Sequence, residues 1–465
     1  MARVATEVVH GTRAPASIRG LVDRDALGAC VLAAAVPFLF LHERYQPDLS
    51  LAAGSATVDV RLSDLALLAV LVVTIAFALR TGIERLRAGR WLWVAGLALL
   101  AWLAFQTFRP ASRGDSLFDD HLVTFAKLVE YAVLTVAVPV LVRRTADLAI
   151  LVGALVLWGG VAVGVGLLQF FGVDIFGAWN AGWRQPSFLG HHDFAALSAV
   201  AIALAAAAIV ARRRETPVPS LLPLALAAGV LGLVLAGSVT AAGGLAVGAA
   251  ALWLAGRRRY RPSGRRTLAL VAVVAVVAGG VVAVRGDTLA DFVRFLGISG
   301  NERPAGVESY SQRTVLAYLG LRIFQDHPVL GVGWQRSTRF DIVEPYLADA
   351  HRRFPDVVEL AFPAEGRPWG IQNLYIQMLA DAGIVGFALL VAVGATGIAL
   401  AWRTAARAPA PWAAGSGLLV LCALLAIAGE WASQGIVPGI PLQATSCLLL
   451  GLAAAGAATA SEASG

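Results

Sequence analysis

Long apolar runs separated by short polar segments dominate the chain, and they set its predicted architecture. Many of these runs approach or exceed the ~18 residues that an α-helix needs to cross a bilayer. A membrane β-barrel would have short alternating segments instead. The pattern predicts an all-α polytopic membrane protein with about twelve transmembrane helices, at roughly residues 26–42, 62–79, 91–107, 122–142, 147–171, 193–211, 220–237, 239–255, 267–284, 380–402, 411–430 and 438–457.

One long segment, residues 285–371, interrupts this pattern. It contains Trp334, Trp369 and several prolines, and it is too long for an ordinary connection and too apolar for a disordered linker. Within it, residues 288–299 have the apolar spacing of a helix that lies on a membrane surface. Residues 313–328 also have helical spacing and stop at a proline. We therefore expect a large loop with its own helices.

This loop divides the chain into three predicted parts. They are an N-terminal membrane bundle of about nine helices over residues 1–284, a large loop on one side of the membrane over 285–371, and about three C-terminal membrane helices over 372–465.

Composition supports the membrane prediction. Hydrophobic residues make up 58% of the 465 residues and charged residues only 14%, whereas a soluble domain has about 25% charged residues. Cys30, Cys422 and Cys447 all lie in apolar runs, which predicts buried thiols rather than a disulfide framework or a metal site.

Arginine placement predicts the orientation. With the N-terminus in the cytoplasm, the inside connections hold 21 arginines and the short outside connections hold five. The positive-inside rule then places both termini in the cytoplasm and residues 285–371 outside. The net charge of +7 is mostly this topology signal, because basic stretches such as RRRYRPSGRR (257–266) suit anionic lipid headgroups. Membrane lipid is an expected partner, and nucleic acid is not.

Polar residues gather where four apolar segments meet the predicted outer face. The four stretches are WRQPSFLGHHDFAAL (183–197), GSVTAAGG (237–244), SQRTVLAYLGLRIFQDHPVLGVG (311–333) and IQNLYIQMLADAGIVG (371–386). Glu430 ends a further apolar run at the same predicted face, where it would face the same cavity, and has no assigned role.

In order and spacing, these stretches resemble the O-antigen ligase and polymerase family of bacterial envelope glycosyltransferases, over about residues 60–455. The family has an arginine before a helix start, as at Arg184, and a serine-containing turn, as at GSVTAAGG. It has an arginine-led helix that ends in P-x-x-G-x-G, as from Arg313 to Gly333. It then has His-Asn, Tyr-Leu-Gln, an acid and G-x-x-G. The corresponding residues here are Gln372-Asn373, Tyr375-Ile376-Gln377, Asp381, and Gly383 with Gly386.

The resemblance implies a GT-C-like fold and an enzyme of surface polysaccharide assembly in the bacterial cytoplasmic membrane. Such an enzyme transfers or polymerises a glycan, carried on a polyprenyl pyrophosphate, onto a hydroxyl of an acceptor glycan or glycolipid. The reaction implied is inverting, takes place on the outer face, and needs neither metal nor cofactor.

Arginine suits the pyrophosphate, because its guanidinium is always protonated and offers forked donors to phosphate oxygens. We expect Arg184 and Arg313 to form a pyrophosphate clamp. Arg322 and Arg336 are weaker candidates for substrate binding. The structural alternative is that these arginines pair with nearby acids or lipid headgroups.

Gln372 departs from the family pattern, because it occupies the position of a histidine thought to deprotonate or orient the acceptor. An amide cannot act as a base near neutral pH, although it can hydrogen-bond a sugar. His191 and His192 are the nearest other candidates for catalysis. The alternative is that both histidines are polar residues at the start of a helix without a catalytic role, with Asp193 as the N-cap.

The remaining amides are candidates for substrate binding. Asn373, Tyr375 and Gln377 are expected to line a cavity beside the phosphate site, and Asp381, one turn further, is expected to pair with an arginine. A plain helix start is the alternative.

Two functions from other classes remain open at the level of sequence. A transporter or flippase for an envelope glycolipid would place polar residues at mid-membrane, and a structural membrane subunit would not need the outer arginines.

Overall fold

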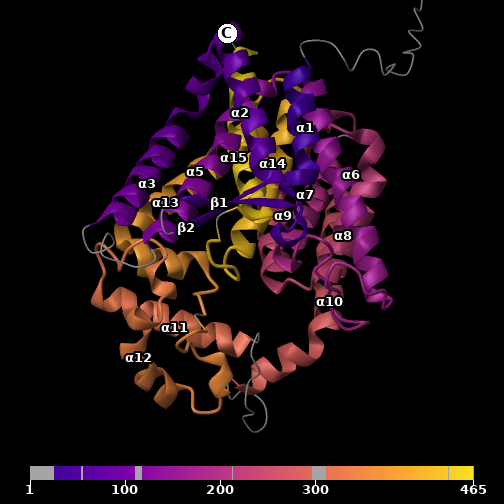
Figure 1. The fold of residues 1–465 in the computed structure, drawn as a ribbon. Helices are drawn as coiled ribbons and strands as arrows, with labels where there is room; N and C mark the ends of the chain where they lie inside the picture. Colours follow the sequence, from indigo (N-terminus) through magenta and orange to yellow (C-terminus); the bar gives the residue numbers. More distant parts are fainter. Residues whose placement is uncertain are drawn as a thin grey trace, which may run out of the picture.

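The structure, a computed structural model, describes residues 26–53, 56–109, 118–211, 213–295, 310–367, 369–437 and 439–463. Within these residues the chain is mostly helical, and the sheet found there has only two strands. The predicted fold class, an all-α polytopic membrane protein, is confirmed. Figure 1 shows long helices side by side, with two shorter helices at the end of the bundle opposite to the C-terminus.

Each predicted membrane segment corresponds to one helix of the bundle. These helices are α1 (Leu27–Leu39), α2 (Leu62–Thr81), α3 (Arg90–Phe108), α5 (Phe118–Leu141), α6 (Thr145–Phe170), α7 (His191–Val210), α8 (Leu222–Ala236), α9 (Val239–Tyr260), α10 (Gly264–Phe295), α13 (Leu374–Arg407), α14 (Pro411–Glu430) and α15 (Pro441–Glu462). Short 3₁₀ segments connect some of them: η2 (Glu43–Tyr45), η3 (Glu84–Gly89), η4 (Arg213–Glu215) and η5 (Pro219–Leu221).

Eleven helices among the described residues are long and apolar enough to cross a membrane. The exception in the bundle is α1, which has 13 residues and is shorter than the ~18–20 residues of a full span. The segment predicted at 26–42 is therefore a short apolar helix.

The predicted break after residue 284 is absent, because α10 continues as one helix through Arg285 to Phe295. The separate surface helix predicted over 288–299 is therefore wrong within residues 288–295, and residues 296–299 lie outside the described part of the chain. No proline interrupts this stretch, and apart from Gly286 its residues are compatible with a helix, so the backbone hydrogen bonds propagate from the spanning segment.

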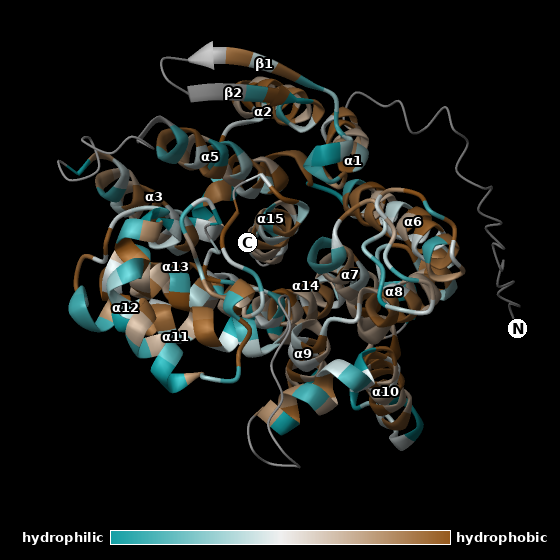
Figure 2. Ribbon diagram, turned by 60° about the horizontal axis from the view of Figure 1, so that its bottom comes forward, coloured by the Kyte–Doolittle hydropathy of each residue, from teal (hydrophilic) through white to brown (hydrophobic). Residues whose placement is uncertain are grey.

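The most buried helices of the bundle are α7, α14 and α15, with 89%, 78% and 61% of their 18-residue apolar windows buried, and α9 packs against α14. Small residues allow these backbones to approach closely, as in many membrane helix pairs. A Cβ at Gly248 of α9 would lie 2.6 Å from the carbonyl oxygen of Cys422, and one at Gly244 would lie 2.8 Å from that of Ala426. Large apolar side chains are exposed on α6, α8 and α10, and these helices carry brown, hydrophobic stretches in Figure 2.

The two shorter helices, α11 (Tyr310–Asp326) and α12 (Phe340–Arg353), form a small domain with η6 (Arg336–Thr338) and η7 (Glu359–Ala361). We call residues 310–367 the cap. The cap has its own apolar core, which includes Val315, Leu319 and Val343. The helix predicted over 313–328 is confirmed as α11, which ends two residues before Pro328.

A glycine turn within the cap, residues 329–334, packs against α13. The turn contains Gly331 (φ 66°) and Gly333 (φ 117°), and it packs where α13 is kinked at Gly383 (φ 66°). Val332 N and Gly333 N donate to the carbonyls of α13, and a Cβ on Gly383 would lie 2.1 Å from the carbonyl oxygen of Val329. Only glycine fits both the left-handed backbone and this approach.

Asp381 closes the same junction. Its carboxylate accepts from the backbone N–H of Ser337 at 2.9 Å and from the side-chain amide of Gln377 at 3.3 Å. The expected pairing of Asp381 with an arginine is therefore wrong among the described residues. A carboxylate satisfied by amide donors holds the cap against α13 without a second charge.

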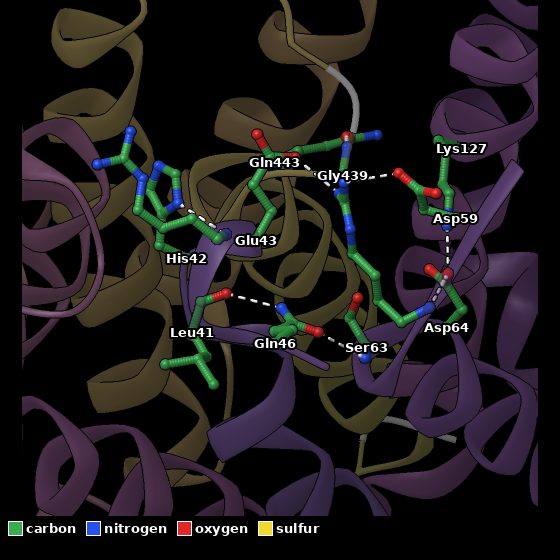
Figure 3. A network of polar contacts seen from close by, with 12 residues as sticks. Leu41, His42, Glu43, Gln46, Asp59, Ser63, Asp64, Lys127, Gly439 and Gln443 are labelled. Carbon is green, nitrogen blue, oxygen red and sulfur yellow. Dashed lines mark hydrogen bonds and ion pairs between the residues drawn. The ribbon is translucent and has the colours of Figure 1, made fainter. Parts of the chain in front are cut away.

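A hairpin of β1 (Asp48–Ala53) and β2 (Ala56–Arg61) follows α1, paired antiparallel from Asp48↔Arg61 to Ala53↔Ala56. Figure 3 shows the polar contacts at its base, where Gln46 donates to Leu41 O at 2.7 Å and accepts from Ser63 N at 3.0 Å. Lys127 of α5 forms an ion pair with Asp64 of α2. These contacts connect three helices beside the 439–443 segment.

We expect Gly383→Ala to destabilise the protein by about 3 kcal/mol, because a Cβ there overlaps backbone atoms of the glycine turn and the residue has positive φ. The measurement is the unfolding temperature of the purified protein in detergent.

The matched control is Gly394→Ala, on the same helix, where an added Cβ meets nothing within 4 Å. This variant should keep or slightly raise the unfolding temperature, since alanine favours helix over glycine. Equal stability of the two variants would contradict the close backbone packing at Gly383.

Candidate functional site

A cavity of about 330 Å³ lies where the cap meets the bundle. Its walls come from the loop before α7, the start of α7, α11, residues 369–377 and residues 434–437. Segments that are far apart in sequence therefore meet at one pocket, and three of the four polar stretches that the sequence singled out contribute side chains to it.

Arg184 lines this pocket from the loop before α7. Its guanidinium carbon lies 4.5 Å from the ring centroid of Trp179, a distance typical of cation–π contact. The loop is held by the buried side chain of Gln185, which accepts from Trp179 N and donates to Asn180 O, both at 2.9 Å. Arg184 is thus held by a rigid loop.

Arg313 lines the same pocket from α11. Its Nε donates to Oε1 of Gln372 at 2.8 Å, and its Nη2 lies 3.3 Å from Nε2 of His192. Its guanidinium carbon lies 5.9 Å from the ring centroid of Tyr310. The structure therefore brings together Arg184, Arg313, Gln372 and His192, as the sequence predicted for a common site.

His192 is buried at the start of α7, and its Nδ1 is hydrogen-bonded to the carboxylate of Glu430. Glu430 is completely buried at the end of α14, and its other oxygen accepts from the hydroxyls of Ser238 and Thr240. Glu430 has no role assigned from the sequence, because no local spacing relates it to a histidine more than 200 residues away. The contact makes Glu430 the partner of a pocket-lining imidazole.

His191 stacks beside His192, with ring centroids 3.9 Å apart, and also faces Trp179. Its Nε2 is buried and has no hydrogen-bond partner among the described residues. His191 lines the pocket as well. The proposed helix cap, Asp193, instead accepts from the backbone N–H of Leu442 at 2.6 Å.

Arg285 is a third guanidinium that sequence analysis missed. It is buried on α10, with its guanidinium carbon 5.1 Å from the centroid of Tyr310. Gly237 (φ 62°) separates it from the loop arginine, since a Cβ there would lie 3.0 Å from Cβ of Arg184 and 3.3 Å from Cδ of Arg285. The only signal in the sequence is an arginine directly after an apolar run.

The three guanidinium groups act on the same imidazole, because Arg184, Arg285 and Arg313 all lie within electrostatic range of His191. Fixed cations concentrated at a pocket favour anionic ligands, and phosphate oxygens suit guanidinium forks. The geometry can therefore bind a phosphate-containing ligand. Among the described residues, no group of three His, Cys, Asp or Glu side chains is placed to hold a metal ion.

The amides at the start of α13 have mostly structural contacts. Asn373 caps the helix by accepting from Tyr375 N and Ile376 N, and it donates to Ala432 O at 2.8 Å. The hydroxyl of Tyr375 donates to Ala428 O at 2.7 Å. Neither side chain is part of the pocket lining, whereas Gln377 is, and it accepts from Ile436 N at 2.7 Å.

The two weaker arginine candidates lie away from the pocket lining. Arg322 donates to Gln325 at 2.8 Å and lies 3.6 Å from the carboxylate of Asp349 on the outer side of the cap. Arg336 donates to Val332 O at 3.3 Å within the glycine turn. The structure does not bring these two side chains to the clamp arginines.

We expect Asn373→Ala to lower stability by about 1–2 kcal/mol, because the variant loses an N-cap that accepts from two N–H groups. The measurement is the unfolding temperature in detergent. Asn373→Asp is the control, since it keeps the accepting oxygen of the cap but loses the donation to Ala432 O, and it should restore only part of the loss. An unchanged unfolding temperature in Asn373→Ala would assign this side chain a role other than capping.

Comparison with known proteins bears on part of this site. Residues 224–391 match the family model for O-antigen ligase. The matched region contains the G-S turn, Arg285, Arg313 and the start of α13, but neither Arg184 and the α7 histidines nor Glu430. No curated protein matches the chain.

Proposed function

We propose that this chain, of which residues 224–391 match the O-antigen ligase family model, moves a glycan from a polyprenyl diphosphate carrier to a hydroxyl of an acceptor glycan or glycolipid. The family assignment implies ligase- or polymerase-type activity in polysaccharide assembly. The finer proposal names the donor, the acceptor and the chemistry of the step.

The observation that carries the proposal is the shared pocket of Arg184 and Arg313, with Arg285 beside it. A diphosphate leaving group gains negative charge as its bond to the anomeric carbon breaks. Preorganised cations aimed at such developing charge are a major source of rate in enzymes. Guanidinium forks match phosphate oxygens in pairs, so these arginines are the groups we assign to the diphosphate.

The step we propose is an inverting displacement that uses no metal. The acceptor oxygen forms a bond to the anomeric carbon from the face opposite to the diphosphate, and the carbon–oxygen bond to phosphate breaks with its electron pair. Gln372 orients Arg313 through the 2.8 Å hydrogen bond to Nε. Gln377 and the neighbouring amides of the pocket lining are donors and acceptors that suit sugar hydroxyls.

We also propose that the pocket faces outward from a bacterial cytoplasmic membrane, with both termini in the cytoplasm. Arginine-rich connections support this orientation, because they gather at the other end of the bundle. There Arg85 pairs with Glu462 near the C-terminus, and Arg259 donates to Ala408 O. Basic residues at one end follow the positive-inside rule.

We expect Arg184→Ala and Arg313→Ala each to lower kcat by about 10²–10³, since each variant removes a donor to the developing charge. The assay supplies purified protein with a polyprenyl diphosphate-linked oligosaccharide and an acceptor, and it measures chain growth or transfer. Lysine at either position should recover only part of the rate, because a point charge cannot form a fork.

Arg352→Ala is the matched control, because Arg352 is an exposed cap arginine that pairs with Asp349. It should leave turnover unchanged. Full activity of folded Arg184→Ala and Arg313→Ala proteins would remove the clamp. Passage of the intact diphosphate-linked glycan across proteoliposomes, with no transfer product, would support a flippase instead.

A further inference from the structure

We infer that His192 is the general base that accepts the proton of the acceptor hydroxyl, with Glu430 as its positioning residue. The inference rests on the proposed transfer reaction and adds the group that activates the acceptor. It also assigns a proton acceptor in a chain where an amide, Gln372, is the hydrogen-bond partner of Arg313.

Gln372 is excluded as the base by its chemistry and by its contact. An amide oxygen does not take up a proton near neutral pH. Its Oε1 already accepts from Nε of Arg313 at 2.8 Å. The amide therefore acts on the orientation of the guanidinium, and the proton of the acceptor needs another destination.

Glu430 sets the tautomer of His192. An ionised carboxylate only accepts hydrogen bonds, so Nδ1 of His192 must carry the proton in their contact. The hydroxyls of Ser238 and Thr240 donate to the same carboxylate, which stabilises its charge in a fully buried position. A histidine held in this way by a buried acid presents Nε2 with a lone pair.

That lone pair is at the pocket. His192 and Arg313 both belong to the pocket lining, and Nε2 lies 3.3 Å from Nη2 of Arg313. Arginine can only donate, so this contact agrees with an accepting Nε2. An anionic diphosphate is a stronger acceptor for the guanidinium than an imidazole nitrogen is. When Arg313 turns toward the diphosphate, the lone pair on Nε2 of His192 becomes accessible beside the reacting sugar.

The proton balance of the step follows. The O–H bond of the acceptor breaks as its oxygen bonds to the anomeric carbon, and the proton moves to Nε2 of His192. The electron pair of the breaking glycosidic bond leaves with the diphosphate. Glu430 stabilises the resulting imidazolium, whose proton then passes to solvent as the products leave.

The test compares His192→Gln with the wild-type protein in kcat, in KM for the donor and in the pH dependence of kcat. Loss of a general base lowers kcat by about 10²–10⁴, and we expect donor KM to stay within about threefold because the arginines remain. Wild-type kcat should fall as the pH drops through the range in which histidine protonates, and this acidic limb should disappear in His192→Gln. The charged and titratable groups that face His192 are Glu430 from α14, Arg313 from α11, and Arg184 and His191 from its own segment.

Glu430 is tested by rescue. Glu430→Gln should lower kcat about tenfold or more, because a neutral amide no longer stabilises the imidazolium, whereas Glu430→Asp should recover part of the rate. A purely packing role would affect the unfolding temperature and leave the pH profile of kcat in place. Both readouts are therefore recorded for each variant.

Two histidine variants serve as controls. His351→Gln breaks a surface pair with Glu359, in which the two atoms are 2.9 Å apart, and it should change nothing. His191→Gln should keep the acidic limb of the profile. If the limb disappears in His191→Gln and persists in His192→Gln, the base is misassigned and the inference is overturned.

The outcomes separate this inference from the proposed function. A wild-type protein that binds the donor but transfers no glycan defeats both. An active wild type with unchanged kcat in folded His192→Gln defeats only the base assignment. If His192→Gln does not fold, the Glu430 variants decide, because an unchanged kcat in folded Glu430→Gln and Glu430→Asp proteins defeats the assignment of His192 as the base.

Discussion

Three guanidinium groups gathered beside a membrane bundle repel one another, and this repulsion constrains the whole site. Like charges at close range cost free energy unless opposing charge, aromatic faces or oriented acceptors compensate. The contacts that do so include Trp179 beside Arg184, Tyr310 between Arg285 and Arg313, and the amide of Gln372. The buried carboxylate of Glu430 is connected to this group through His192, which contacts Arg313. An anionic substrate would supply further negative charge against this repulsion. The repulsion among the arginines therefore favours binding of the proposed ligand.

Buried amides position the arginines by fixing loops. Gln185 holds the turn that carries Arg184, Asn373 fixes the start of α13 against residues 431–432, and Gln377 binds the backbone of residue 436. Their partners are mostly backbone groups that would otherwise be buried without hydrogen bonds, a costly state in a low-dielectric interior. Some side chains that the sequence predicted to bind sugar therefore also hold the backbone in place. The glycine turn and Asp381 hold the cap against α13.

The sequence predicted the bundle well, because membrane helices leave a length and hydropathy signal that needs no tertiary information. It also predicted that Arg184, Arg313 and His192 share a site, since all three follow or begin apolar helices at one face. It did not predict that α10 continues through Arg285, because the polar residues 285–287, which include a glycine, suggested a break between the apolar run and the helix expected at 288–299. It gave Glu430 no role and missed that Asp381 binds backbone, since both contacts depend on how distant segments pack. The sequence also did not show that Arg322 and Arg336 lie away from the pocket, because their positions too depend on how distant segments pack.

The length of α10 has a consequence for the depth of the site. At a rise of about 1.5 Å per residue, Arg285 lies about 32 Å along the helix from Gly264, and the hydrocarbon core of a bilayer is about 30 Å thick. If Arg265 and Arg266 lie at one edge of the hydrocarbon core, Arg285 lies near the opposite edge. Under the proposed function, the carrier lipid then enters the pocket from the side, with its isoprenoid tail among the acyl chains and its headgroup at the depth of the arginines.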